Sequence, residues 1–176
     1  MKATGIVRKV DELGRIVLPK DIRRSLGLKE GTPMEIFING NMLVLKQYSQ
    51  LQNFQNQAKL ITECLAKTLD CDVVITDLSN CISCSGKNKK ELENITVTSN
   101  LDKIINDRKT VIHNKISKQN ILQTQLEILS ILITPIVVNG DCYGSIICLS
   151  TNKEFVTSDA KCVNMMACLI SNKCDL

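Results

Sequence analysis

Two short apolar runs open the chain and are separated by turn residues. Residues 5–10 and 15–18 have the apolar and β-branched content of strands, and residues 11–14 between them include Asp, Glu and Gly. Pro19 and Gly27 then bracket about two turns of helix, because proline suits a first helical turn and glycine suits the position after the last one. The pattern therefore predicts a β-hairpin followed directly by a short helix.

A second hairpin is predicted a few residues later. Residues 34–38 and 42–45 are apolar runs, and Asn39-Gly40 lies between them. An Asn-Gly pair between two apolar runs is the strongest short-range signal for a hairpin, because its backbone tolerates the positive φ angles of a tight turn.

The strands of this second hairpin are apolar on both faces. Ile36 and Ile38 alternate with Phe37, and Val44 alternates with Leu45. A unit of about 47 residues is too small to bury both faces of a sheet against itself. The pattern therefore predicts an obligate dimer in which two copies intertwine and share one core.

Apolar residues in the next segment recur at spacings of three and four. The positions are Leu51, Phe54, Ala58, Ile61 and Leu65. A seam of about two heptads suits a helix that pairs with its copy in another subunit, and we expect these residues to serve oligomerisation. An ordinary amphipathic helix lying on its own domain has the same pattern and is the alternative.

Strands and helices alternate through the rest of the chain. Two strands, a helix, a long hairpin and a final helix are expected over residues 72–77, 81–86, 99–108, 126–149 and 158–174. The hairpin turns at Asn139-Gly140. A sheet covered by the helices at the ends of such an order is an α+β sandwich, and α+β is the expected fold class.

Positive charge is concentrated at the N-terminus. Residues 1–47 carry nine Lys or Arg against five Asp or Glu, so the whole net charge of +4 belongs to them. Four of the five arginines are Arg8, Arg15, Arg23 and Arg24. A guanidinium group can donate two parallel hydrogen bonds to a phosphate or a guanine edge, which an ammonium group cannot do. This distribution predicts contact with nucleic acid, and a solvated basic face is the alternative.

Composition narrows the partner and the location. Aromatic residues make up 3% of the chain and Trp is absent, which disfavours the base stacking used to bind RNA and single strands. We therefore expect double-stranded DNA as the partner. No apolar run approaches about 18 residues and the start does not resemble a signal peptide, so a cytoplasmic, nucleoid-associated protein is expected, with no membrane partner.

The N-terminal sequence resembles a known family. Residues 4–26, TGIVRKVDELGRIVLPKDIRRSL, resemble the signature of the AbrB-type swapped-hairpin DNA-binding domain, and the resemblance extends to about residue 47. It implies an interlocked β-barrel homodimer that regulates bacterial transcription. It also implies that DNA is contacted by residues at the matching positions, namely Arg8, Lys9, Arg15, Arg23 and Arg24.

The C-terminal part is similar to the GAF sensor fold, and the whole chain resembles a family of sporulation regulators that combine the two modules. The resemblance implies a DNA-binding domain over residues 1–47, a linker over 48–56 that leads into a helix, and a GAF-like α/β sandwich over 57–176. It implies that the terminal helices join two DNA-binding dimers into a tetramer. It also implies a small-molecule ligand in the GAF-like domain, whose identity the sequence does not give.

Nine cysteines include one Cys-x-x-Cys pair, Cys81 and Cys84. These thiols are interpreted as packing residues, with a dithiol redox pair or half of a metal site as alternatives. No second pair supplies two more ligands, so neither a metal nor a cofactor is expected. His113, the one histidine, is expected in an exposed loop without a nucleophile partner, and no catalytic residue and no enzyme are predicted.

Two other classes of function stay open. Some GAF-fold proteins are thiol-dependent reductases of free methionine sulfoxide, and Cys71, Cys81 and Cys84 are the thiols that could serve such a reaction. Swapped-hairpin domains also occur in antitoxins, which usually continue as a disordered tail. Here a near-neutral segment with folded-domain patterning follows, which favours a regulator over an antitoxin.

Overall fold

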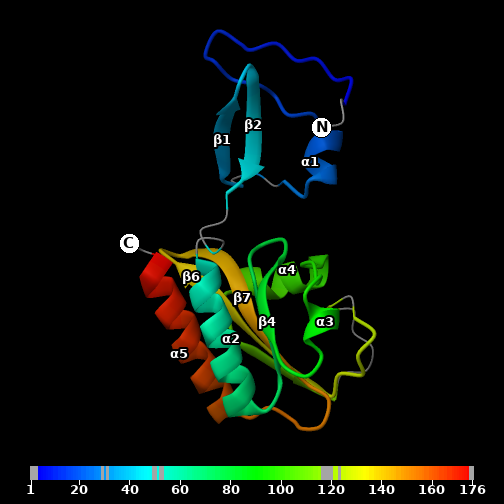
Figure 1. Ribbon diagram of the computed structural model, residues 1–176, viewed down its shortest axis with the longest axis vertical. Coiled ribbons are helices and arrows are strands. Elements are labelled where there is room, and N and C mark those ends of the chain that lie inside the picture. The colour runs from blue at the N-terminus through cyan, green and yellow to red at the C-terminus, as the bar shows by residue number, and fades with distance from the viewer. Residues whose placement is uncertain are drawn as a thin grey trace. The chain divides into compact units, whose positions relative to one another are not determined.

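The computed structural model divides the chain into two compact units, Met1–Tyr48 and Ser49–Leu176 (Figure 1). It describes residues 4–28, 30, 32–48, 51, 54–115, 121–122 and 124–174. Within these residues, the first unit has one hairpin of paired strands and one helix, and the second has a five-stranded sheet with helices on both faces.

The hairpin of the N-terminal unit pairs β1 (Met34–Asn39) with β2 (Met42–Gln47) in antiparallel register. Asn39 lies opposite Met42, so Gly40 occupies the first central position of a two-residue turn. Its φ of 57° is readily adopted by glycine, which has no Cβ. The predicted second hairpin is confirmed, with its turn one residue later than expected.

Helix α1 (Lys20–Ser25) forms where it was predicted, but Pro19 is its N-cap residue and not part of its first turn. Gly27 follows its end with a φ of 66°, and this left-handed conformation turns the chain back. The N–H of Leu28 then donates to the carbonyl oxygen of Arg23 at 2.8 Å, which satisfies one of the terminal carbonyl groups of the helix.

The predicted first hairpin is only partly formed. A turn is present, because the N–H of Asp11 donates to the carbonyl oxygen of Arg15 at 3.0 Å, but residues 5–10 and 15–18 are not strands. Val7 and Val17 are exposed by 84% and 73%. The strand prediction is wrong for a single chain, because a strand needs a neighbour to pair with and an apolar face needs cover. The described residues of this chain form no closed barrel.

The C-terminal unit is built on an antiparallel sheet with strand order β4-β3-β7-β6-β5. The strands are β3 (Asp72–Thr76), β4 (Cys81–Ser85), β5 (Val111–Asn114), β6 (Ser130–Val138) and β7 (Asp141–Ser150). The β6–β7 hairpin turns at Asn139 and Gly140, whose φ angles of 50° and 87° suit a tight two-residue turn. The predicted long hairpin is therefore confirmed, whereas the four-residue β5 was not anticipated.

Helices cover both faces of this sheet (Figure 1). Helices α2 (Gln55–Leu69) and α5 (Thr157–Cys174) lie on one face, and the shorter α3 (Lys89–Leu92) and α4 (Ser99–Asn106) lie on the other. Successive side chains along a strand point to opposite faces of the sheet. Leu132 therefore belongs to the core under α2 and α5, and Ile133 belongs to the core under α3 and α4. The predicted α+β class is confirmed.

The five residues of the expected oligomerisation seam lie in the core of their own unit. Leu51, Phe54, Ala58, Ile61 and Leu65 are each exposed by 8% or less and pack against the sheet and α5. This packing corresponds to the alternative of an amphipathic helix lying on its own domain. The outward side of α2 carries Leu60, which is exposed by 66%. No helix in the described parts of the chain is long and apolar enough to cross a membrane.

Candidate nucleic-acid interface

All five residues expected to contact DNA are exposed in the N-terminal unit: Arg8, Lys9, Arg15, Arg23 and Arg24. Arg23 and Arg24 lie in the last turn of α1, where the helix dipole favours a positive charge. A terminal Nη1–H of Arg8 donates to the carbonyl oxygen of its neighbour Val7 at 3.1 Å. Within the residues that the structure describes, Arg15 is the one member of the set with a carboxylate partner.

That partner is Asp11, which also organises the turn before Arg15. Its Oδ1 accepts the backbone N–H of Leu13 at 3.0 Å and that of Arg15 at 2.7 Å. Its Oδ2 accepts the Nε–H of Arg15, also at 2.7 Å. The backbone N–H and then the side chain of Arg15 lower the pKa of Asp11, so the carboxylate stays ionised throughout the neutral range.

The N-terminal unit leaves its apolar side chains uncovered. None of its described residues is buried. The cross-strand partners Ile38 and Leu43 are exposed by 83% and 56%, and Val7 and Val17 are exposed as well. Apolar surface of this extent is typical of a unit that associates with another copy.

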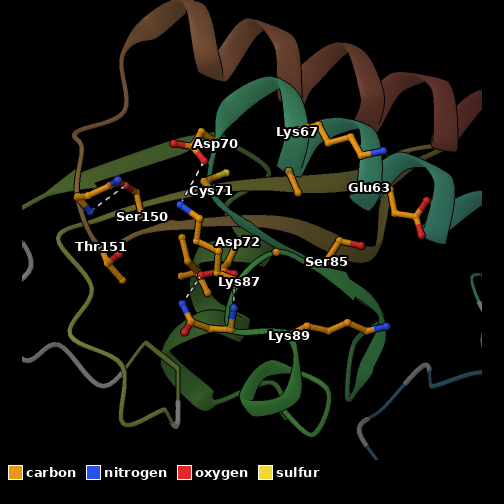
Figure 2. A pocket seen from close by; sticks show the side chains of 15 residues that line it. Glu63, Lys67, Asp70, Cys71, Asp72, Ser85, Lys87, Lys89, Ser150 and Thr151 are labelled. Carbon is orange, nitrogen blue, oxygen red and sulfur yellow. Dashed lines mark hydrogen bonds and ion pairs between the residues drawn. The ribbon is translucent and has the colours of Figure 1, made fainter.

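A cavity of about 640 Å³ lies in the C-terminal unit, where β3 begins, β4 and β7 end, and α2 ends above them (Figure 2). Most of the residues that line it are polar or charged, among them Lys67, Lys87, Asp70 and Asp72. Lys87 and Asp70 form an ion pair at 3.5 Å on its rim. The resemblance implied a ligand in this domain, but the sequence did not locate the cavity, because its lining comes from segments far apart in the chain.

Asp72 orders one side of the cavity. It is exposed by only 5%, and its carboxylate accepts the backbone N–H of Asn88 at 2.8 Å and the amide Nδ2–H of Asn88 at 2.7 Å. A Cβ at Gly86 would lie 2.2 Å from Oδ1 of Asp72, so only glycine allows this approach. This glycine at the end of a strand was the one local signal in the sequence.

Cys81 and Cys84 are brought together by a β-bulge in strand β4. Thr76 pairs with Cys81 and Val74 with Cys84, so the additional residue Ile82 places both thiols on the same face. Burial raises the pKa of Cys81 to about 12, with a further contribution from the adjacent Cys84. Both thiols are protonated at neutral pH, which suits packing and not thiolate chemistry.

The other thiol of the reductase hypothesis lies on the opposite face of the sheet. Cys71 packs against the core under α2 and α5, whereas Cys81 and Cys84 belong to the core under α3 and α4. The three thiols therefore do not meet in one pocket. His113 is half-buried in β5 opposite Ile131, so its expected loop position was wrong. Among the described residues, no group of three or more His, Cys, Asp or Glu is placed to hold a metal ion.

Comparison with protein families matches both units. Residues 51–174 match the family model described as "Stage V sporulation protein T C-terminal, transcription factor". Residues 7–52 match the model described as "Antidote-toxin recognition MazE, bacterial antitoxin". Stage V sporulation protein T of Bacillus subtilis (strain 168) is 35% identical over 169 residues, which cover 95% of each protein. The transition state regulatory protein AbrB of the same organism is 54% identical over 48 residues, covering 27% of this chain and 50% of AbrB.

Solved structures show the fold of the C-terminal unit. The PixJ GAF domain of Thermosynechococcus elongatus superposes with a TM-score of 0.59 at 13% identity, over 73% of this chain and 89% of that one. The type II free methionine-R-sulfoxide reductase of Thermoplasma acidophilum superposes equally well, with a TM-score of 0.59 at 15% identity, over 70% and 94% of the two chains. At these identities the likeness concerns the fold alone.

A basic N-terminal module of the AbrB type followed by a GAF-like domain defines a DNA-binding transcription regulator. Because the family model covers most of the chain and the full-length relative is 35% identical, the chain belongs to the stage V sporulation protein T family of transcription factors.

Proposed function

We propose that two copies of the chain intertwine through their N-terminal units and bind duplex DNA with Arg8, Lys9, Arg15, Arg23 and Arg24. The observation that carries the proposal is that these five cations are exposed in the unit that holds the whole net charge of +4. Such a unit attracts a polyanion while the neutral C-terminal unit does not. The proposal places the protein in the cytoplasm, on the nucleoid, and assigns it no catalytic step.

Replacing any one of the four arginines by Ala should weaken duplex binding by about 1–3 kcal/mol, because each change removes a charge-assisted contact. Fluorescence anisotropy at several salt concentrations measures this loss. The wild-type affinity should fall steeply with salt, with a log–log slope of about −0.9 for each neutralised phosphate.

Arg108→Ala is the matched control, because Arg108 is the one arginine of the C-terminal unit and should not contribute to DNA affinity. Unchanged binding in all four N-terminal variants would refute the proposed interface. A loss for Arg108→Ala equal to theirs would show that the effect reflects total charge and not position.

We infer that two such dimers join through the outward face of α2 and α5. Leu60 of α2 is exposed by 66%, and Met165 and Leu169 of α5 are exposed by 60% and 49%. Cys64 of α2 and Cys168 of α5 are exposed as well. The two helices lie side by side on one face of the sheet (Figure 1). Because these side chains are exposed, they lie on the outward sides of the two helices, where we infer that they form one apolar surface. This face replaces the buried seam as the candidate contact between subunits.

We also propose that the 640 Å³ cavity is the place where the GAF-like domain takes a small polar ligand. Its volume suits a small molecule, and its rim presents cations and carboxylates together.

A panel of amino acids and nucleotides should include at least one compound that raises the melting temperature of the protein by about 5 °C at saturation. The Thr151→Trp variant, which adds bulk at the exposed rim, should lose that shift. A panel without any stabilising member, or a shift that survives in Thr151→Trp, would contradict the proposal.

A further inference from the structure

The carboxylate of Asp11 accepts three hydrogen bonds from the turn that follows it. One oxygen, Oδ1, accepts the N–H groups of Leu13 and Arg15, which closes the turn over residues 11–15. The other oxygen, Oδ2, lies 2.7 Å from Nε of Arg15. A single carboxylate therefore holds both the backbone and the side chain of Arg15.

The hydrogen bond to Nε leaves the Nη1 and Nη2 groups of Arg15 free of Asp11. A guanidinium group has five N–H donors, and only the Nε–H is taken by Asp11. The Nη1 and Nη2 groups form the fork that matches two adjacent acceptors on a phosphate or on a guanine edge. The side chain of Arg15 is exposed by 70%, so this fork can reach a ligand.

Arg15 differs from the other arginines of the unit because a carboxylate orients its side chain in the absence of DNA. Among the described residues, Arg8 bonds to the carbonyl group of its own neighbour, and Arg23 and Arg24 have no carboxylate partner. A side chain that is already oriented loses less conformational entropy on binding, which favours affinity and selectivity.

We propose that Asp11 is a positioning residue for DNA binding, which orients Arg15 so that its Nη1–Nη2 edge makes a two-bond contact with the duplex. The inference rests on the proposed function, since it assumes that Arg15 contacts DNA. Charge alone predicts the opposite result. A carboxylate on a DNA-binding surface repels phosphates, so on charge alone its removal would tighten binding.

The test compares Asp11→Asn with Glu12→Gln in the full-length chain. Both variants remove one negative charge, but Glu12 makes no bond to Arg15, whereas Asp11 makes two. In Asp11→Asn the remaining Oδ1 can still accept the backbone N–H groups of the turn, while an N–H donor replaces the acceptor that faced Nε. We expect Asp11→Asn to bind about tenfold more weakly to a duplex selected by the wild-type protein from a random pool. Glu12→Gln should bind as tightly as the wild type or more tightly.

A double-mutant cycle separates positioning from general damage to the turn. In an Arg15→Ala background, Asp11→Asn should cause no further loss, because the group that it orients is gone. Unchanged or tighter binding by Asp11→Asn alone would overturn the inference, and so would a tenfold loss that persists without Arg15. If those results occur while Arg8→Ala and Arg23→Ala still weaken binding, only the role of Asp11 fails. If those arginine variants bind like the wild type, the proposed function itself fails.

Discussion

Ile61→Asp should unfold the C-terminal unit, although the same change at the neighbouring Leu60 should leave it folded. Ile61 is exposed by 7% and packs in the core between α2, α5 and the sheet. The substitution removes a large apolar side chain and places a carboxylate in an apolar core. Cavity formation and charge burial together cost about 5 kcal/mol or more, which is comparable to the whole stability of a domain. Loss of the circular-dichroism signal of the helices in mild urea measures this effect.

Leu60→Asp is the matched control and also tests the subunit contact. Leu60 is exposed by 66%, so its replacement should change the stability of the unit by no more than about 0.5 kcal/mol. Light scattering should nevertheless report dimers in place of tetramers, because two such carboxylates would face the apolar surface of α2 and α5. A variant that stays tetrameric would exclude this face as the contact. A folded, stable Ile61→Asp variant would instead show that α2 does not pack on its own sheet.

Gly144→Ala should be the most damaging of the glycine substitutions. A Cβ at Gly144 would lie 1.9 Å from the carbonyl oxygen of Thr76 and 2.9 Å from Cδ1 of Leu51. The closest atom belongs to the backbone of the adjacent strand β3, so no rotamer change relieves the contact. Strands β3 and β7 must separate locally, and we expect the free energy of unfolding to fall by about 3 kcal/mol. Urea denaturation of the full-length protein provides the measurement.

Gly140→Ala separates this steric effect from the general consequence of replacing a glycine. Nothing lies within 4 Å of a Cβ built at Gly140, although its φ of 87° disfavours alanine. The loss there should be about 1 kcal/mol, from backbone strain alone. Equal losses at Gly140 and Gly144 would contradict the close approach of the two strands.

Local signals predicted the elements whose structure depends on nearby residues. Pro19 and Gly27 bracketed α1, and Asn139-Gly140 located the turn of the long hairpin, because each of these residues restricts or extends the backbone angles at its own position. The exposed arginines were also anticipated, since charged guanidinium groups are rarely buried unless they are paired.

The sequence did not predict which surface an apolar face or a strand packs against. The spacing of Leu51, Phe54, Ala58, Ile61 and Leu65 correctly indicated one apolar face of a helix. It could not tell whether that face meets another subunit or its own sheet, because both surfaces are apolar. Residues 15–18 have the composition of a strand, yet composition supplies no neighbouring strand to pair with.

Side chains and glycines along this chain dictated where it turns, which segments coil or extend, and where its positive charge collects. These properties arise within a few residues, so they can be deduced from the order of amino acids. Folding at long range selected which face of α2 is buried, brought Asp72 beside Gly86 and Asn88, and separated Cys71 from Cys81 and Cys84. Those outcomes depend on contacts between segments far apart in the chain, and no local pattern encodes them because many arrangements bury the same apolar residues equally well.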